Sequence, residues 1–283
     1  MLDLSVCICA DSTCDLTPEL TAQYGVVITP LYISMGDDSR RDGEDCRAED
    51  IFDYYRRTKK LCTTAAVTIG DYIDVFSREL KTHDEIVHFT ISSDMSACYQ
   101  NAVDAAREFD GRVYVVDSRN LSTGIGQLVL DAAIMAREGR SGGEIFADME
   151  QRKEKLNVSF VIDTLEYLHK GGRCSGVAAL GANLLRLKPV IEVNGGVMGV
   201  GKKYRGTLDK CVTAYVAERI GDGTGADRRR IFITDSGVSE ELVAAVRDIL
   251  ERAGFREILH TRTGGTVSSH CGPGTLGILY YDE

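Results

Sequence analysis

The sequence lacks the features of several protein classes. Its 33 basic and 43 acidic side chains give a formal net charge of −10, which repels phosphate backbones, so we expect no nucleic-acid ligand. No basic segment precedes an apolar run near the N-terminus, so we expect no signal peptide. The informative uncharged stretch from Cys174 to Leu185 has about half the length of a membrane span, so we expect no integral membrane segment. Hydrophobic residues at 43% and charged residues at 27% exclude disordered and fibrous chains.

The cysteine pattern lacks the spacing of a disulfide framework or a zinc ribbon. Nine cysteines are an odd number with irregular spacing, and Cys7 and Cys9 form a C-x-C rather than a C-x-x-C. The five histidines show no metal-ligand spacing either. The sequence therefore predicts reduced, mostly buried thiols, a cytoplasmic location and no metal site.

Standard catalytic and cofactor signatures are also missing. There is no G-x-S-x-G elbow, no H-E-x-x-H and no Walker A sequence. Gly124-Ile125-Gly126 lacks the third glycine of a dinucleotide fingerprint and does not directly follow a predicted strand. The motifs alone therefore predict no cofactor and no catalytic residue.

The pattern of apolar runs predicts an α/β fold in two domains, because 283 residues exceed one typical domain. Over residues 1–157, strands alternate with helices, which requires crossover connections and predicts a mainly parallel sheet with flanking helices. Over residues 158–283, Gly195-Gly196 between two apolar runs predicts a hairpin, and hence a mixed sheet. The strands expected in the first domain are Val6–Ala10, Val26–Ile33, Glu85–Ile91 and Arg112–Val116.

Small hydroxylated residues follow several of these strands. They occur in Asp11-Ser12-Thr13, in Ser92-Ser93-Asp94-Met95-Ser96 and in Asp117-Ser118, while Thr63-Thr64 precedes a predicted helix. Ligands of open α/β sheets bind at the carboxyl ends of strands. The hydroxyls could therefore line an anion site, or they could only cap the helices that follow them.

His270 lies in the turn-rich segment Ser268–Gly274 before the last predicted strand. A histidine in a glycine loop can be presented to a ligand, but it can equally be satisfied by a loop carbonyl. Arg173 ends a second glycine-containing segment, and Lys202, Lys203 and Arg205 form a basic cluster beyond the hairpin. The segment Ala178–Leu187 is almost uncharged and could be either a buried helix or an apolar wall beside a basic mouth.

Five ordered motifs resemble those of the DegV family of bacterial fatty-acid-binding proteins along essentially the full chain. They are A-D-S-T-C-D-L, T-I-S-S-D-M-S-A-C-Y-Q, V-D-S-R-N-L-S-T-G-I-G-Q, Y-L-H-K-G-G-R and H-C-G-P-G-T-L-G. The family segment T-S-Q-P-S is here Thr64-Ala65-Ala66-Val67-Thr68, and the usual S-G-T is Ser96-Ala97-Cys98.

The resemblance implies one long-chain fatty acid buried between the two domains, with its carboxylate held by Thr64, Ser96 and His270. It also implies that the protein is a carrier rather than the catalyst, and that a separate fatty-acid kinase phosphorylates the carboxylate. Arg173 and Arg205 match family arginines near the mouth, where they would serve the phosphoryl group or the kinase interface. The remaining residues expected to bind the ligand are Thr63, Ser92, Ser93 and Gly272.

Two other classes of function remain open from the residues. Ser96 and His270 could serve a small-molecule hydrolase or transferase, or the chain could resemble a dihydroxyacetone-kinase subunit in which a histidine engages the substrate. A hydrolase needs an acid that orients its histidine, and no acidic residue is obviously placed for that role. A pure interaction protein is the least favoured, because it would not need clustered hydroxyls.

Overall fold

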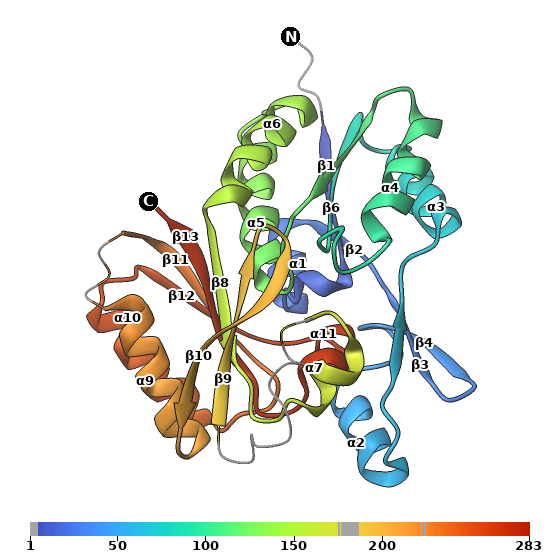
Figure 1. Cartoon of the computed structure of the whole chain (residues 1–283). Coiled ribbons are helices and arrows are strands. Elements are labelled where there is room, and N and C mark those ends of the chain that lie inside the picture. Colours follow the sequence, from blue (N-terminus) through green and yellow to red (C-terminus); the bar gives the residue numbers. More distant parts are fainter. Residues whose placement is uncertain (1–4, 175, 177–186, 222, 224) are drawn as a thin grey trace.

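The computed structural model describes residues 5–174, 176, 187–221, 223 and 225–283, in which the strands form three sheets (Figure 1). The first sheet has the order β2-β1-β6-β7, and all of its strands are parallel. Its strands are β1 (Val6–Asp11), β2 (Val26–Thr29), β6 (Glu85–Thr90) and β7 (Val113–Asp117). This arrangement confirms the parallel sheet predicted for the first half of the chain.

Helices cover both faces of the parallel sheet. In Figure 1, α3 and α4 lie on one side of it, and α1, α5 and α6 lie on the other. Thr17 accepts a hydrogen bond from Leu20 N at the start of α1, and Thr68 and Ser141 cap α3 and α6 in the same way. These helices are α1 (Pro18–Tyr24), α3 (Ile69–Glu79), α4 (Cys98–Ala106), α5 (Thr123–Arg137) and α6 (Gly142–Arg152).

The segment predicted as one strand, Val26–Ile33, is two strands in different sheets. Strand β2 ends at Thr29, and β3 (Tyr32–Met35) begins after Pro30 and Leu31. Proline has no backbone N–H to donate to a ladder, so the pairing with β1 stops there. Strand β3 pairs instead with β4 (Asp38–Arg41) and β5 (Thr63–Ala65) in a small antiparallel sheet that the sequence did not predict.

The third sheet is mixed, as predicted for the second half. Its order is β10-β9-β8-β13-β11-β12, in which β11 and β12 are parallel and the other pairs are antiparallel. The strands are β8 (Leu156–Val161), β9 (Leu187–Asn194), β10 (Val197–Arg205), β11 (Ala226–Asp235), β12 (Glu257–Arg262) and β13 (Leu276–Asp282). The predicted hairpin is confirmed as β9-Gly195-Gly196-β10. Helices α9 (Leu208–Ile220) and α10 (Glu240–Arg252) cover this sheet.

Helix α5 lies between the two large sheets (Figure 1). It packs on β1 and β6 of one sheet and on β8 and β13 of the other, and it is buried over most of its length. Gln127 donates from Nε2 to the backbone oxygens of Arg230 and Leu279, which joins α5 to β11 and β13. The predicted α/β fold is confirmed, whereas the domain division at residue 157 stays a prediction; β8 begins at Leu156.

Three further helices lie beside the small antiparallel sheet. They are α2 (Ala48–Thr58), α7 (Glu166–Gly171) and α11 (Gly265–Cys271), and α11 packs against the other two. Helix α11 also contacts β3 and β5. The chain thus brings residues from both of its halves together around α11.

Candidate functional site

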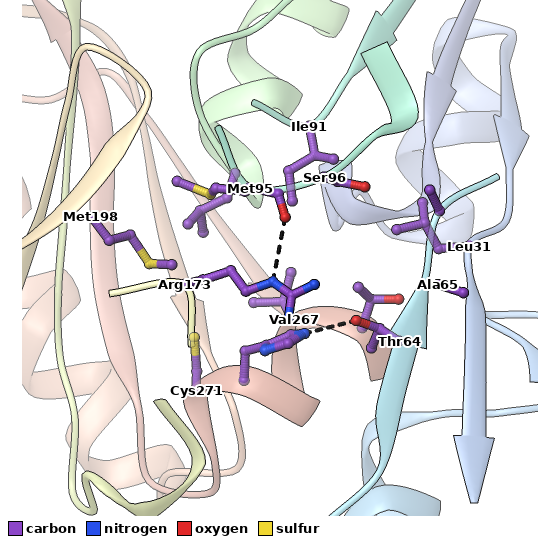
Figure 2. Close-up of a pocket in the computed structure, with 14 residues that line it drawn as sticks. Leu31, Thr64, Ala65, Ile91, Met95, Ser96, Arg173, Met198, Val267 and Cys271 are labelled. Atoms are coloured by element: carbon purple, nitrogen blue, oxygen red, sulfur yellow. Dashed lines mark hydrogen bonds between the residues drawn. The ribbon is translucent and has the colours of Figure 1, made fainter. Parts of the chain in front are cut away.

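An apolar pocket lies where α11 meets strand β5 and the loops after the parallel strands (Figure 2). The space between its atoms is about 540 Å³ when open solvent at the mouth is included, and the centres of water-sized molecules can occupy about 60 Å³ of it. Most of its wall is hydrocarbon or sulfur, and a few polar side chains interrupt it. The lining residues are Leu31, Thr64, Ala65, Ala66, Ile91, Met95, Ser96, Leu121, Arg173, Met198, Thr266, Val267, His270 and Cys271.

A hydrogen bond between Thr64 and His270 closes one side of the pocket. Thr64 Oγ1 and His270 Nε2 are 2.8 Å apart, and the dashed line that ends at Thr64 in Figure 2 marks this hydrogen bond. Thr64 lies on β5 in the first half of the chain, and His270 lies in the last turn of α11. The hydroxyl–imidazole pair therefore joins the two halves of the chain at the pocket.

The imidazole of His270 is held in its neutral form. Burial of the ring and, secondarily, the positive charge of Arg173 lower the pKa of His270 to about 4. Its Nδ1 is buried and has no hydrogen-bond partner among the described residues. A neutral imidazole without an acidic partner can donate one N–H to an anion that enters the pocket.

Gly171 allows α7 to approach the His270 ring. A Cβ atom at position 171 would overlap His270 Nδ1. Any larger residue would therefore push the imidazole away from Thr64. The glycine pair of the Y-L-H-K-G-G-R motif has a steric role at this position.

Arg173 supplies positive charge at the edge of the same pocket. Its Nε donates to Met95 O at 3.4 Å and its Nη1 donates to Gly171 O at 2.8 Å. No acidic side chain within the described part of the chain forms an ion pair with it. A guanidinium held by carbonyls and lacking a counter-charge favours the approach of an anion.

His270 lies on a helix, not in the glycine loop that the sequence predicted. The start of α11 has no side-chain cap of its own, since its N-cap residue is Gly264. Two buried carboxylates from the first half of the chain replace it: Asp15 Oδ1 accepts from Gly264 N at 2.8 Å and Asp42 Oδ1 accepts from Gly265 N at 2.7 Å. These hydrogen bonds from distant residues stabilise the start of a helix that no capping residue in the local sequence predicts.

Ser96 lines the pocket but does not touch His270. Its Oγ donates to Cys98 Sγ at 3.2 Å and accepts from Cys98 N at 3.3 Å. A Ser–His–acid relay needs a serine bonded to the histidine and an acid bonded to the other ring nitrogen. Neither contact is present among the described residues, so the geometry does not favour the hydrolase hypothesis.

Five other residues predicted to bind the ligand lie outside the pocket. Thr63 is exposed on β5 next to Thr64, and Arg205 is exposed at the end of β10. Ser92 donates to Gly196 O at 2.8 Å, and Ser93 accepts from Arg119 Nη1 at 3.0 Å, so both tie their loop toward the β9–β10 hairpin.

Gly272 has a backbone role instead. Its φ is +73°, and a Cβ there would overlap the Tyr167 ring. Its carbonyl accepts from Ser236 Oγ at 2.5 Å. It therefore ends α11 tightly against α7 and does not line the pocket.

The sequence did not point to the apolar lining. Leu31, Ile91 and Leu121 each follow a parallel strand, and Met198 lies on β10. They resemble ordinary core residues in sequence, because an apolar side chain carries the same pattern whether it faces a core or a cavity. The predicted apolar wall over 178–187 lies, except for Leu187 at the start of β9, outside the described residues.

Comparisons with known proteins identify the family of this chain. The family model described as DegV, a family of uncharacterised proteins, matches residues 5–283. The chain belongs to the DegV family. A DegV domain-containing protein of Deinococcus radiodurans is 33% identical over 281 residues, covering 97% of this chain and 98% of that protein.

Two solved DegV structures have the same fold. A DegV family protein from Thermus thermophilus, described as binding fatty acid, is 33% identical, with a TM-score of 0.90 over 99% of this chain and 100% of that chain. DegV from Bacillus subtilis, described as a fatty-acid-binding protein, is 22% identical, with a TM-score of 0.86 over 99% of this chain and 100% of that chain. Among the described residues of this DegV chain, no helix has the length and apolarity to cross a membrane.

Proposed function

We propose that this protein binds one long-chain fatty acid, with the carboxylate at Thr64, Ser96 and His270 and the acyl chain against the apolar wall. The observation that carries the proposal is the 2.8 Å hydrogen bond between Thr64 and His270 at one side of an otherwise apolar pocket. The relative from Thermus thermophilus, 33% identical over nearly the full chain, is described as binding fatty acid and supports the same ligand class.

The pocket's chemistry fits an amphiphile with one anionic end. Each buried methylene contributes about 0.8 kcal/mol, so a long alkyl chain supplies most of the affinity. A buried carboxylate is costly unless its oxygens accept hydrogen bonds. Two hydroxyls and an imidazole N–H satisfy those oxygens, and Arg173 adds positive charge nearby without a bidentate clamp.

The same arrangement suits a carrier that works with a separate kinase. A carboxylate bonded to hydroxyls and a neutral imidazole keeps its nucleophilic oxygens, whereas a bidentate arginine would neutralise them. In the proposed reaction, a carboxylate oxygen attacks the γ-phosphorus of ATP on the partner kinase, ADP leaves, and the acyl phosphate stays on the carrier. Arg173 and the exposed Arg205 are the residues we assign to the phosphoryl group or the kinase surface.

The first test is organic extraction of the purified, denatured protein followed by mass spectrometry. We expect about one fatty acid per chain, because a buried tail dissociates slowly. A chain that extracts empty, and whose melting temperature does not rise with added fatty acid, contradicts the proposal, since tight binding must stabilise the fold.

A matched pair of threonine variants tests the head-group assignment. Thr64→Val removes the hydroxyl in the pocket, and we expect fatty-acid affinity to fall by about 10- to 100-fold, the effect of a lost hydrogen bond to a charged group. Thr63→Val, on the same strand but exposed, is the control and should bind as the wild type does. Equal affinities for the two variants would remove Thr64 from the site.

The kinase step has its own measurement. The loaded protein with ATP alone should form no acyl phosphate, and addition of a fatty-acid kinase should form it. Acyl phosphate produced by the isolated chain would show that the chain is itself the catalyst.

A further inference from the structure

Three side chains able to bind a metal ion, Cys7, Glu79 and His83, converge at the end of the parallel sheet opposite the pocket, and Cys9 contacts Cys7 there. Cys7 and Cys9 lie two residues apart on β1, so their side chains are on the same face of the sheet. Glu79 is the last residue of α3, and His83 follows four residues later. The fatty-acid pocket is at the carboxyl ends of the parallel strands, whereas Cys7 is near the start of β1.

The sulfur atoms of Cys7 and Cys9 have a separation close to that of two thiolates around a tetrahedral zinc ion. Cys7 Sγ lies 3.6 Å from Cys9 Sγ and 3.9 Å from Glu79 Oε2. Cys7, Glu79 and His83 place one donor atom each within 4.8 Å of one another. Two thiolates on one zinc are about 3.8 Å apart, because each Zn–S bond is about 2.3 Å long and the angle is tetrahedral.

Neighbouring groups orient two of these ligands. Arg78 Nε donates to Glu79 Oε1 at 2.8 Å, which leaves Oε2 on the side of Cys7. His83 Nδ1 lies 3.1 Å from Glu79 O and 3.2 Å from Thr82 Oγ1, while Nε2 has no hydrogen-bond partner among the described residues. Metal-binding histidines commonly donate their other ring N–H to a backbone carbonyl in this way.

The burial of the cluster suits an ion that enters from the surface. Cys9 is fully buried and Cys7 is 3% exposed, but the Glu79 side chain is 14% exposed and His83 is half-buried. The two thiols therefore lie at the buried end of the cluster, and the carboxylate and imidazole lie nearer to solvent.

We propose that Cys7, Cys9, Glu79 and His83 form a structural zinc site that joins β1 to the end of α3. Two thiolates, one imidazole and one carboxylate complete a four-coordinate set that suits zinc and excludes magnesium and calcium, which prefer all-oxygen sites. Binding deprotonates both thiols and releases their protons to solvent. The sequence motifs predict no such site, because the donors come from a C-x-C strand and a distant helix end.

The test titrates zinc into the full chain after treatment with a chelator and a disulfide reductant, with a chromophoric chelator as competitor. We expect one zinc per chain, and a thiolate-to-metal absorption band when cobalt(II) replaces zinc. Cys7→Ser should weaken zinc binding by more than about a hundredfold, since loss of even an outer-shell partner costs about 10- to 100-fold.

Two further variants separate metal binding from folding. His83→Gln changes a half-buried side chain, so it should fold normally while losing zinc affinity. Cys62→Ser removes a buried thiol elsewhere, in the core beside α2, and should bind zinc as the wild type does.

Three outcomes overturn the zinc site. One is equal zinc affinity in the wild type, Cys7→Ser and His83→Gln; another is the absence of the cobalt–thiolate band. The third is a protein isolated without zinc whose Cys7 and Cys9 are paired as a disulfide. Zinc should also raise the melting temperature of the wild type and not that of His83→Gln.

Discussion

Asp42 caps helix α11 through Gly265, a residue 223 positions away in the sequence. Its Oδ1 accepts from Gly265 N at 2.7 Å, and its Oδ2 accepts from Thr266 N at 3.2 Å and from Ser12 Oγ at 2.9 Å. Because α11 carries His270, the first half of the chain sets the position of an imidazole in the second half.

Replacing Asp42 should therefore loosen α11. We expect Asp42→Ala to lower the free energy of unfolding by about 1–2 kcal/mol, the usual cost of a lost helix cap, and to weaken fatty-acid binding because His270 moves. Denaturant unfolding and a fatty-acid titration measure the two effects. Asp38→Ala, an exposed aspartate on the same β-hairpin, is the control, and an equal loss in both variants would contradict the capping role.

The raised pKa of Asp15 leads us to expect that the folded protein loses stability as pH rises. Burial raises the pKa of Asp15 from 3.8 to about 8, although Ser122 Oγ and Gly264 N donate to it. Between these values the folded chain holds one proton more than the unfolded chain, so this group's contribution to the free energy of unfolding falls as pH rises. Asp15→Asn cannot ionise, and its stability should fall less than that of the wild type between about pH 5 and pH 8. Parallel stability curves for the two proteins would refute this assignment.

The positive charge of Arg173 should have a measurable effect on the pKa of His270. Burial is the main reason that the pKa of His270 is lowered to about 4, and the Arg173 guanidinium is the second. Arg173→Gln should raise that pKa while leaving it below the ordinary value of 6.5, since the ring stays buried. An NMR titration of the His270 ring measures the change, and Arg205→Gln, outside the pocket, should leave it where it is.

The carboxylate of Asp131 on α5 forms ion pairs with three arginines. Its carboxylate bonds Arg230 Nη1 at 3.0 Å, Arg229 Nη2 at 3.0 Å and Arg152 Nη1 at 2.8 Å, and both Asp131 and Arg230 are buried. Asp131→Asn would leave the buried Arg230 with Glu257, which is 41% exposed, as its remaining carboxylate partner, so we expect the free energy of unfolding to fall by up to about 3–5 kcal/mol. Urea denaturation tests this. Asp148→Asn, which breaks a more exposed pair with Arg152, should cost much less.

The sequence determined the elements whose signals are local. Thr17 with Pro18 and Thr68 start helices where capping rules place them, and Gly195-Gly196 forms the expected hairpin. The wrong strand, Val26–Ile33, shows the limit of an apolar run, because Pro30 ends the pairing with β1 within it. The five motifs were sufficient to recognise the family, and the three residues that the resemblance assigned to the carboxylate, Thr64, Ser96 and His270, line one pocket.

The tertiary structure alone decided how that pocket is built. His270 is on a helix because Asp15 and Asp42, far away in sequence, accept the amide hydrogens that open it. The apolar lining could not be predicted from the sequence, because a leucine that faces a cavity occurs in the same local sequence pattern as a leucine that faces a core. Local sequence specifies hydrogen bonds within a turn of chain, whereas a binding site is made by side chains that meet only after the sheets have packed on α5.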